Sequence, residues 1–470
     1  SGAANVAVGI NSLAANTTAD NNTAVGKDAM LSNTTGTQNS ALGHEALASN
    51  TEGNYNVAVG RLALYENTTA SNNTAVGLKA LEKNTTGAQS VAVGADALKT
   101  QTTGNNNSAF GYCAMALNTT GCLNTAIGNF ALKTTQTGCK NTAVGYQSMF
   151  DATSALCNTA LGAYSLTNIT TGDFNTALGA CSLLCNTTAA NNTAVGYNSL
   201  FNNTTGADNL AVGRQALQSN TTGAQNIGIG TCALYTQQTG GGCNVSIGNY
   251  SLKLNTTGDN NVAVGYSALC ANTTASDNTA MGVESLKDHT TGGNNTAYGA
   301  YSAANTTTAQ GVVAIGRAAL ETNTTGNYNV AVGQSALLSS TTGASNVAIG
   351  TESLDVNTTG ADNTAVGTNS LGAHTTGANN AALGSGSGSG ITTGSSNSTF
   401  GGTAGRQITT GGNNTSIGRE SGLVLTTGSY NIALGANSTH SGTGVAREIV
   451  IAYDETGKGS DTAFLDGSSG

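Results

Sequence analysis

The residues with the most evident chemical potential are Asn-Thr-Thr triplets, which recur along the chain. N-x-T is the acceptor sequence for N-glycosylation, so each exposed triplet of a secreted eukaryotic chain could carry a sugar. Stacked Asn amides and Thr hydroxyls can instead form hydrogen-bonded ladders that fix a turn. The candidate acceptors are Asn16, Asn33, Asn67, Asn84, Asn118, Asn186, Asn203, Asn220, Asn255, Asn272, Asn323 and Asn357.

Other copies of the same segment help to separate these two interpretations. Eight copies keep Thr-Thr-Gly but replace the Asn, with Gln101, Ile169, His289, Ser340, His374, Ile391, Ile408 and Leu425. A Thr kept for sugar attachment would be free to change once the Asn had gone. The pattern therefore favours a structural role for Thr-Thr-Gly, with glycosylation as the alternative.

Regular Thr columns on a flat face also suggest ice binding. Ice-binding faces usually need a T-x-T pair whose members point the same way. Here the two Thr are adjacent, as in Thr17-Thr18, and adjacent strand residues point to opposite faces. Ice binding is therefore the less favoured reading.

Nine cysteines lie between Cys113 and Cys270, with no CxxC and no His at zinc spacing. Cys122 and Cys139 are 17 residues apart, which is the length of the sequence repeat described below. If each repeat forms one turn of a coil, the two cysteines lie on neighbouring turns about 5 Å apart. This separation is compatible with a disulfide. The other cysteines are interpreted as free, small apolar residues.

The remaining reactive side chains do not form a catalytic arrangement. There are four histidines, and the two that share a repeat position, His289 and His374, are five coils apart, about 24 Å. No Ser-His-Asp set, nucleophile elbow, phosphate loop or dense carboxylate pair stands out, and the repeated G-G-x-G-x-D pattern of calcium β-rolls is absent. We expect no enzymatic activity, no cofactor and no metal site.

The element that must position all these residues is a repeat of constant length. From Gly9 to Gly435, 26 glycines end an N-x-A-V-G-like pentad. Successive glycines are seventeen positions apart in every case but one, the interval from Gly230 to Gly248, which is a single position longer. The consensus is N-T-A-V-G-x-x-A-L-x-x-N-T-T-G-x-x, numbered here from position 1 at the Asn. Such regularity predicts one repeat per turn of a coil.

Seventeen residues suit one or two short strands and their turns, and Thr and Val favour strand while Gly and Asn interrupt it. The sequence therefore predicts an all-β parallel β-solenoid, or β-roll, of about 26 coils. Ala-Val at positions 3 and 4 and Ala-Leu at positions 8 and 9 are the expected core. So thin a core, with small residues that let backbones approach, favours a homotrimeric rod; a monomer with a narrow core is the alternative.

Composition excludes several classes of protein. The chain of 470 residues has 65 Gly, no Pro, no Trp, 8% charged residues and a net charge of −9. A disordered chain is usually highly charged or proline-rich, and a nucleic-acid binder needs a basic stripe. No apolar run reaches the roughly 20 residues that span a bilayer. We therefore expect no nucleic-acid partner and no membrane insertion.

The pentads Asn22 to Gly26 (NTAVG), Asn56 to Gly60 (NVAVG) and Asn346 to Gly350 (NVAIG) resemble the head repeats of trimeric autotransporter adhesins, whose motif is N-S-V-A-I-G followed by G-x-x-A. The resemblance implies a left-handed parallel β-roll with three chains around one axis. Similar repeats occur in viral and bacteriophage tail fibres that precede a self-cleaving chaperone domain. The family's usual repeat is shorter by three positions, so we expect one corner of the longer coil to bulge.

The ends of the repeat suggest the domain organisation. Residues 1–446 are assigned to the repeat solenoid, regular over 5–379, while 380–446 are Gly/Ser-rich degenerate coils that include GSGSGSG, Gly384 to Gly390. Because the repeat spacing continues through this run, we interpret it as a slimmer stretch, with a hinge as the alternative. In 447–470, Ala452 and then Leu465 take the Gly slot, at an interval shorter than a full repeat. This segment is expected to hold shortened coils that lead to a neck or to a C-terminal domain absent from this sequence.

These observations predict a structural fibre or spacer of an extracellular or virion appendage, such as a tail fibre, adhesin or filament, at a cell or virion surface. Its partners would be further copies of itself, side by side and end to end, and a cell-surface or glycan receptor. The alternative is a monomeric glycosylated or ice-binding solenoid. Receptor contact would use the variable positions 6, 7, 10 and 11, for example Arg61, Tyr112, Tyr146, Tyr197, Arg214 and Arg317.

Overall fold

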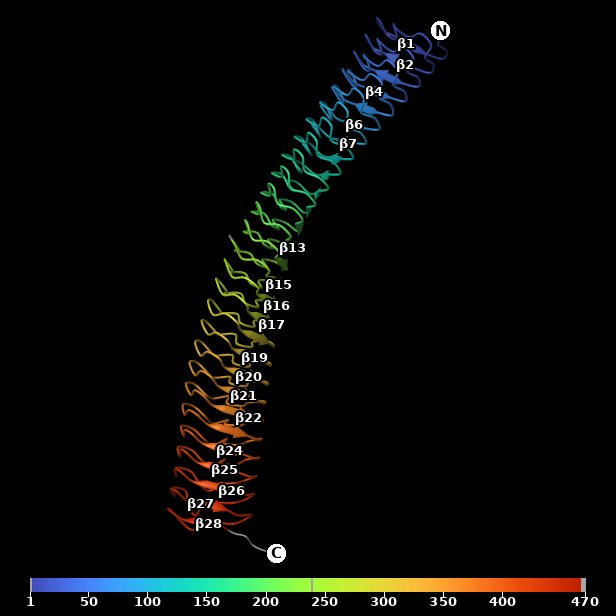
Figure 1. The fold of residues 1–470 in the computed structure, drawn as a ribbon. Helices are drawn as coiled ribbons and strands as arrows, with labels where there is room; N and C mark the ends of the chain where they lie inside the picture. The colour runs from blue at the N-terminus through green and yellow to red at the C-terminus, as the bar shows by residue number, and fades with distance from the viewer. Residues whose placement is uncertain (1, 238–239, 466–470) are drawn as a thin grey trace. The chain divides into compact units, whose positions relative to one another are not determined.

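The computed structural model describes residues 2–237 and 240–465. These residues form two compact units, Ser1–Gly240 and Gly241–Gly470. Within each unit the chain coils repeatedly, and every coil contributes one three-residue strand to a parallel stack (Figure 1). The described residues contain no helix. The predicted all-β parallel β-solenoid is confirmed, with about 27 turns and 17-residue spacing.

The described part of the first unit holds fourteen strands, and neighbouring strands pair in parallel at an offset of one repeat. They are β1 (Val6–Val8), β2 (Thr23–Val25), β3 (Ser40–Leu42), β4 (Val57–Val59), β5 (Thr74–Val76), β6 (Val91–Val93), β7 (Ser108–Phe110), β8 (Thr125–Ile127), β9 (Thr142–Val144), β10 (Thr159–Leu161), β11 (Thr176–Leu178), β12 (Thr193–Val195), β13 (Leu210–Val212) and β14 (Ile227–Ile229).

The second unit has the same pattern, with another fourteen strands up to residue 465, where its described part ends. They are β15 (Val245–Ile247), β16 (Val262–Val264), β17 (Thr279–Met281), β18 (Thr296–Tyr298), β19 (Val313–Ile315), β20 (Val330–Val332), β21 (Val347–Ile349), β22 (Thr364–Val366), β23 (Ala381–Leu383), β24 (Ser398–Phe400), β25 (Thr415–Ile417), β26 (Ile432–Leu434), β27 (Ile449–Ile451) and β28 (Ala463–Leu465).

The last coil is shorter than the others. β27 pairs with β28 so that Ile451 lies opposite Leu465, whereas Leu434 on β26 lies opposite Ile451 at the full repeat length. The sequence interpretation that put Leu465 in the slot of Ala452 was wrong by one position, because Leu465 ends a strand and occupies position 4. Of the terminal segment 447–470, residues 466–470 lie outside the described part of the chain.

Each coil bends at residues with left-handed backbone conformation. In the coil 192–208, Asn198, Leu200 and Asp208 have φ of 55°, 49° and 59°, a conformation that costs a non-Gly residue roughly 1–2 kcal/mol. Hydrogen bonds between coils offset this cost: the N–H of Leu200 donates to the carbonyl of Ala216 at 3.0 Å, and that of Asp208 to Ala190 at 3.2 Å. The backbone ladder thus continues around the bends as well as through the strands.

The glycine at position 5 serves packing within the chain. Gly196 has a φ of 129°, and a Cβ placed on it would lie 2.6 Å from the carbonyl oxygen of Gly213 on the next coil. From the sequence, small residues at this position are expected to let separate chains approach. The structure gives instead an intramolecular reason, since stacked coils leave no room for a side chain.

The interior contains amides as well as aliphatic groups. Asn192 and Asn203 are buried, and both side-chain amides donate to the carbonyl oxygen of Gly206 at 2.9 Å. The Asn192 Oδ1 atom accepts the backbone N–H of Asn209 on the next coil at 3.0 Å. Positions 1 and 12 therefore form two internal amide ladders, and these satisfy backbone groups that burial would otherwise leave unpaired.

In the Gly/Ser-rich coils, a smaller residue at one interior position is compensated by a larger residue at another, so the interior stays filled. At position 9, Gly388 and Gly405 replace the usual Leu, with φ of 60°. At position 12 of the same coils, Ile391 and Ile408 replace Asn and are fully buried. A Cβ on Gly388 would lie 3.1 Å from the Ile391 Cδ1 atom. Strands β23 to β26 accordingly continue in 17-residue register.

Candidate functional site

The outward face of the strand stack is the surface with the most unusual composition. Side chains alternate between the two faces of a strand, so in β12 Ala194 faces inward and Thr193 and Val195 face outward. Ala194 is fully buried, whereas Val195 is partly exposed. The sequence interpretation that placed both Ala and Val of each pentad in the core is therefore wrong for the position-4 residue. In each unit, we call the surface made by positions 2 and 4 of its strands the outer strand face.

Position 4 is apolar or aromatic in every described strand, although none of these side chains is buried. The exposed fraction reaches 57% for Val8 in the first unit and 69% for Leu465 in the second. Position 2 alternates among Thr, Ser and aliphatic residues, and neither position carries a charged residue in any strand that the structure describes. Within each unit, an uncharged face with exposed apolar side chains is typical of an interaction surface.

The candidate glycosylation residues lie in the interior. Asn16, near the end of the first unit, is half-buried, and the other eleven are fully buried. Their amides are engaged: in Asn67 the Nδ2 atom donates to the Ala70 carbonyl at 3.0 Å and to the Asn50 Oδ1 atom at 2.8 Å. The folded coil does not present these side chains to a glycosyltransferase.

The two Thr of each triplet play different parts. Thr204 donates its hydroxyl to the carbonyl of Thr221 on the next coil at 3.0 Å. Thr205 is exposed. Only one of the two hydroxyls per coil therefore faces solvent freely, and the other belongs to the ladder.

Three of the four histidines are buried and the fourth, His44, is half-buried. His289 and His374 occupy position 12, and each ring Nε2 atom contacts the carbonyl of the following glycine, Gly292 or Gly377. Burial lowers the pKa of both imidazoles, and the contact with that carbonyl opposes this shift. His440 is also buried, 3.2 Å from the Glu448 carboxylate.

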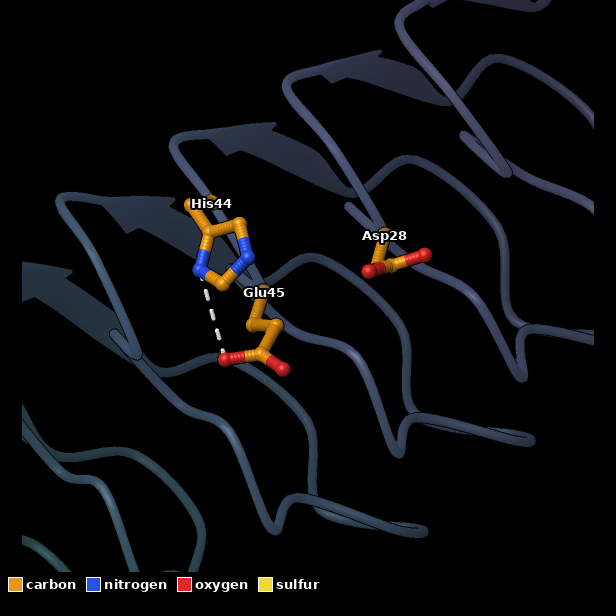
Figure 2. Close-up of side chains that lie close together, drawn as sticks. All are labelled: Asp28, His44 and Glu45. Atoms are coloured by element: carbon orange, nitrogen blue, oxygen red, sulfur yellow. Dashed lines mark ion pairs between the residues drawn. The ribbon is translucent and has the colours of Figure 1, made fainter.

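His44 lies on the surface near two carboxylates (Figure 2). Ligand atoms of Asp28, His44 and Glu45 lie within 4.8 Å of one another. The carboxylates already have partners, because Asp28 pairs with Lys27 at 3.0 Å and Glu45 with the His44 Nδ1 atom at 3.3 Å. Hydrogen bonds from Asn11 and Lys27 hold the pKa of Asp28 below its usual value. The arrangement is explained by these ion pairs.

The structure brings Cys122 and Cys139 together. Their Sγ atoms are 2.8 Å apart and not bonded, and both side chains are half-buried. The hydrogen bond with Cys139 raises the pKa of the Cys122 thiol, and burial adds to the effect.

The residues predicted for receptor contact lie on the surface. Arg61, Tyr112, Tyr146, Tyr197, Arg214 and Arg317 are exposed.

Sequence reasoning missed an aromatic row at positions 6 and 7 of four successive coils. Tyr112, Phe130, Tyr146 and Tyr164 pack edge to face, with ring centroids 5.3, 6.1 and 5.3 Å apart. The row could have been found by aligning the coils and listing the aromatic residues at neighbouring positions.

Comparison with protein-family models and with curated proteins found no match. Among the described residues, no helix is long and apolar enough to cross a membrane.

Proposed function

We propose that the chain is a non-enzymatic structural fibre, built from several copies that associate through the outer strand face. The observation that supports this is the pattern at position 4, which is apolar in all the described strands but never buried within one chain. In the same coils the buried positions 1 and 12 tolerate amides. Apolar side chains kept on the outside, with polar ones inside, indicate a surface that another molecule covers.

The size of the face suits a stable interface. A three-residue strand spans about 10 Å, and fourteen strands at about 4.8 Å spacing extend about 65 Å. One unit therefore offers about 650 Å² of face, and two partners together about 1,300 Å², within the range of specific protein interfaces.

The partner that fits this surface best is another copy of the chain. Position-4 side chains recur once per coil, so only a surface with the same rise per repeat can match them along a whole unit. A second copy in parallel register has that rise, and the absence of charge on the face removes any repulsion between like copies. The resemblance to trimeric adhesin heads favours three chains around one axis.

Such an assembly would act mechanically, as a stiff extracellular or virion-surface spacer that projects a binding surface. Positions 6 and 7, which follow the strand, would remain available for a cell-surface or glycan receptor. End-to-end joining would extend the fibre.

The test is a mass measurement in solution by light scattering or analytical ultracentrifugation. We expect three times the chain mass of 46.2 kDa; a monomer at all concentrations would refute self-association and favour the solitary solenoid, with or without sugar. The variant Leu178→Asp/Val195→Asp/Val212→Asp places three charges on the outer strand face and should dissociate the assembly. The control Ala180→Asp/Tyr197→Asp/Arg214→Asp changes position-6 residues of the same coils, outside that face, and should leave the mass unchanged.

A further inference from the structure

In the first unit the residue at position 16 can accept a backbone hydrogen bond from the preceding coil. In two coils this residue is a cysteine. In several coils an oxygen atom of the position-16 side chain accepts a backbone N–H from the preceding coil: Asn54 Oδ1 accepts from Thr37 at 2.7 Å, Asn105 Oδ1 from Ala88 at 2.7 Å, and Asp173 Oδ1 from Leu156 at 2.7 Å. Other coils have Ala or Leu at this position. On two coils between Asn105 and Asp173, this position is held by Cys122 and Cys139.

Sulfur performs this task poorly. The Cys139 Sγ atom does lie 3.0 Å from the Cys122 backbone nitrogen, but sulfur is a weak hydrogen-bond acceptor compared with an amide or carboxylate oxygen. Support of the hydrogen-bond ladder therefore does not explain a cysteine on both coils. Its distinctive result is the contact between the two Sγ atoms at 2.8 Å.

The geometry points to a disulfide-forming pair: we propose that Cys122 and Cys139 are a site of oxidative cross-linking that closes one complete coil covalently. Parallel neighbours about 4.8 Å apart fall within the Cα separation that disulfides adopt. Both side chains are half-buried and so partly open to solvent. The remaining cysteines never occupy the same position on successive coils.

The reaction balances with a small disulfide as oxidant, such as oxidised glutathione. One cysteine, as thiolate, attacks a glutathione sulfur, breaks that S–S bond and releases one reduced glutathione. The second thiolate then attacks the resulting mixed disulfide, forms the Cys122–Cys139 bond and releases the second glutathione. The two thiols lose two electrons and two protons, and the oxidant gains them.

The bond would close a ring that contains one whole turn of the solenoid. Because position 16 is not part of the outer strand face, the cross-link is compatible with a single chain and with an assembly. The proposal therefore does not depend on the function proposed above.

The experiment uses the full chain, incubated with oxidised glutathione and then digested with trypsin without reduction. Cleavage after Lys99, Lys133 and Lys140 puts Cys122 in peptide 100–133 and Cys139 in peptide 134–140. We expect these peptides to be joined, two of the nine thiols to be lost, and a reducing agent to reverse both changes. Hydrogen exchange over 122–139 should slow on oxidation.

Two variants identify the partners. Peptide 100–133 also contains Cys113, so Cys113→Ser should keep the cross-link and Cys122→Ser should abolish it. The proposal is overturned if the wild-type chain keeps all its thiols, carries only glutathione adducts, or cross-links through Cys113 or between chains. The wild-type result stands by itself should a variant fail to fold.

Discussion

The amide ladder at position 1 can be tested at Asn141, because in this coil no position-12 side chain donates to the carbonyl that Asn141 binds. The Asn141 Nδ2 atom donates to the Ala155 carbonyl at 2.7 Å, and its Oδ1 atom accepts the backbone N–H of Asn158 at 3.0 Å. In most coils the corresponding carbonyl has a further donor at position 12, but here that position is Ala152. Asn141→Ala therefore leaves one buried carbonyl and one buried N–H unpaired.

Each unpaired buried backbone group costs about 1–3 kcal/mol, so we expect the two groups left unpaired by Asn141→Ala to lower the free energy of unfolding by about 2–6 kcal/mol. The matched control is Asn202→Ala, because Asn202 is half-buried at position 11 and its side chain makes no hydrogen bond among the described residues. That substitution should stay within about 0.5 kcal/mol of wild type.

Urea unfolding followed by circular dichroism measures the global effect. A long repeat can unfold in parts, so hydrogen exchange at the Asn158 amide gives a local reading that does not assume a single transition. We expect this amide to exchange much faster in Asn141→Ala and to be unaffected in Asn202→Ala. Equal stability and equal exchange in both variants would refute a stabilising role for the ladder.

Three further predictions concern single positions. Gly401→Ala should destabilise the second unit by about 2 kcal/mol or more in thermal unfolding, because φ of Gly401 is 135° and a Cβ atom there would lie 2.6 Å from the Gly418 backbone. The neighbouring substitution Gly402→Ala should be neutral, because a Cβ atom at that position would have no atom closer than 4.0 Å. Val312→Asn should raise the free energy of unfolding by about 1 kcal/mol. At position 1 an Asn side chain accepts the backbone N–H of the next coil, as Asn329 Oδ1 does from Asn346 at 2.9 Å, whereas the buried Val312 offers the Asn329 N–H no acceptor. An unchanged urea midpoint would contradict this. Burial lowers the pKa of His289 and His374, so protonation favours the unfolded chain and the stability of the fold should fall as the pH drops below about 6.5. The variant His289→Asn/His374→Asn should lose less stability than wild type when unfolding midpoints are compared at pH 7.5 and pH 5. An identical loss in both proteins would argue against this explanation.

The repeat length, the parallel pairing and the one-coil-per-repeat plan could all be predicted from the spacing of Gly9, Gly26 and their successors. The direction of Val195 could also have been predicted, because adjacent residues of one strand cannot both face the core. The left-handed conformation of Leu200 could not, since nothing in the preference of leucine suggests it and only the hydrogen bonds between coils impose it. The contact between Cys122 and Cys139 could be predicted, because both occupy the same position of successive repeats.

The interior amides also bear on how such a chain can change its length. Each Asn of position 1 bonds to the coil that follows, and that coil offers the same groups in the same places to the next one. Removing or duplicating one entire repeat therefore rejoins matching partners, whereas a change of any other size must be absorbed within a single coil, as in the longer interval from Gly230 to Gly248. Unequal recombination between repeated stretches of the gene would thus lengthen or shorten the protein by whole coils without redesign of its interior.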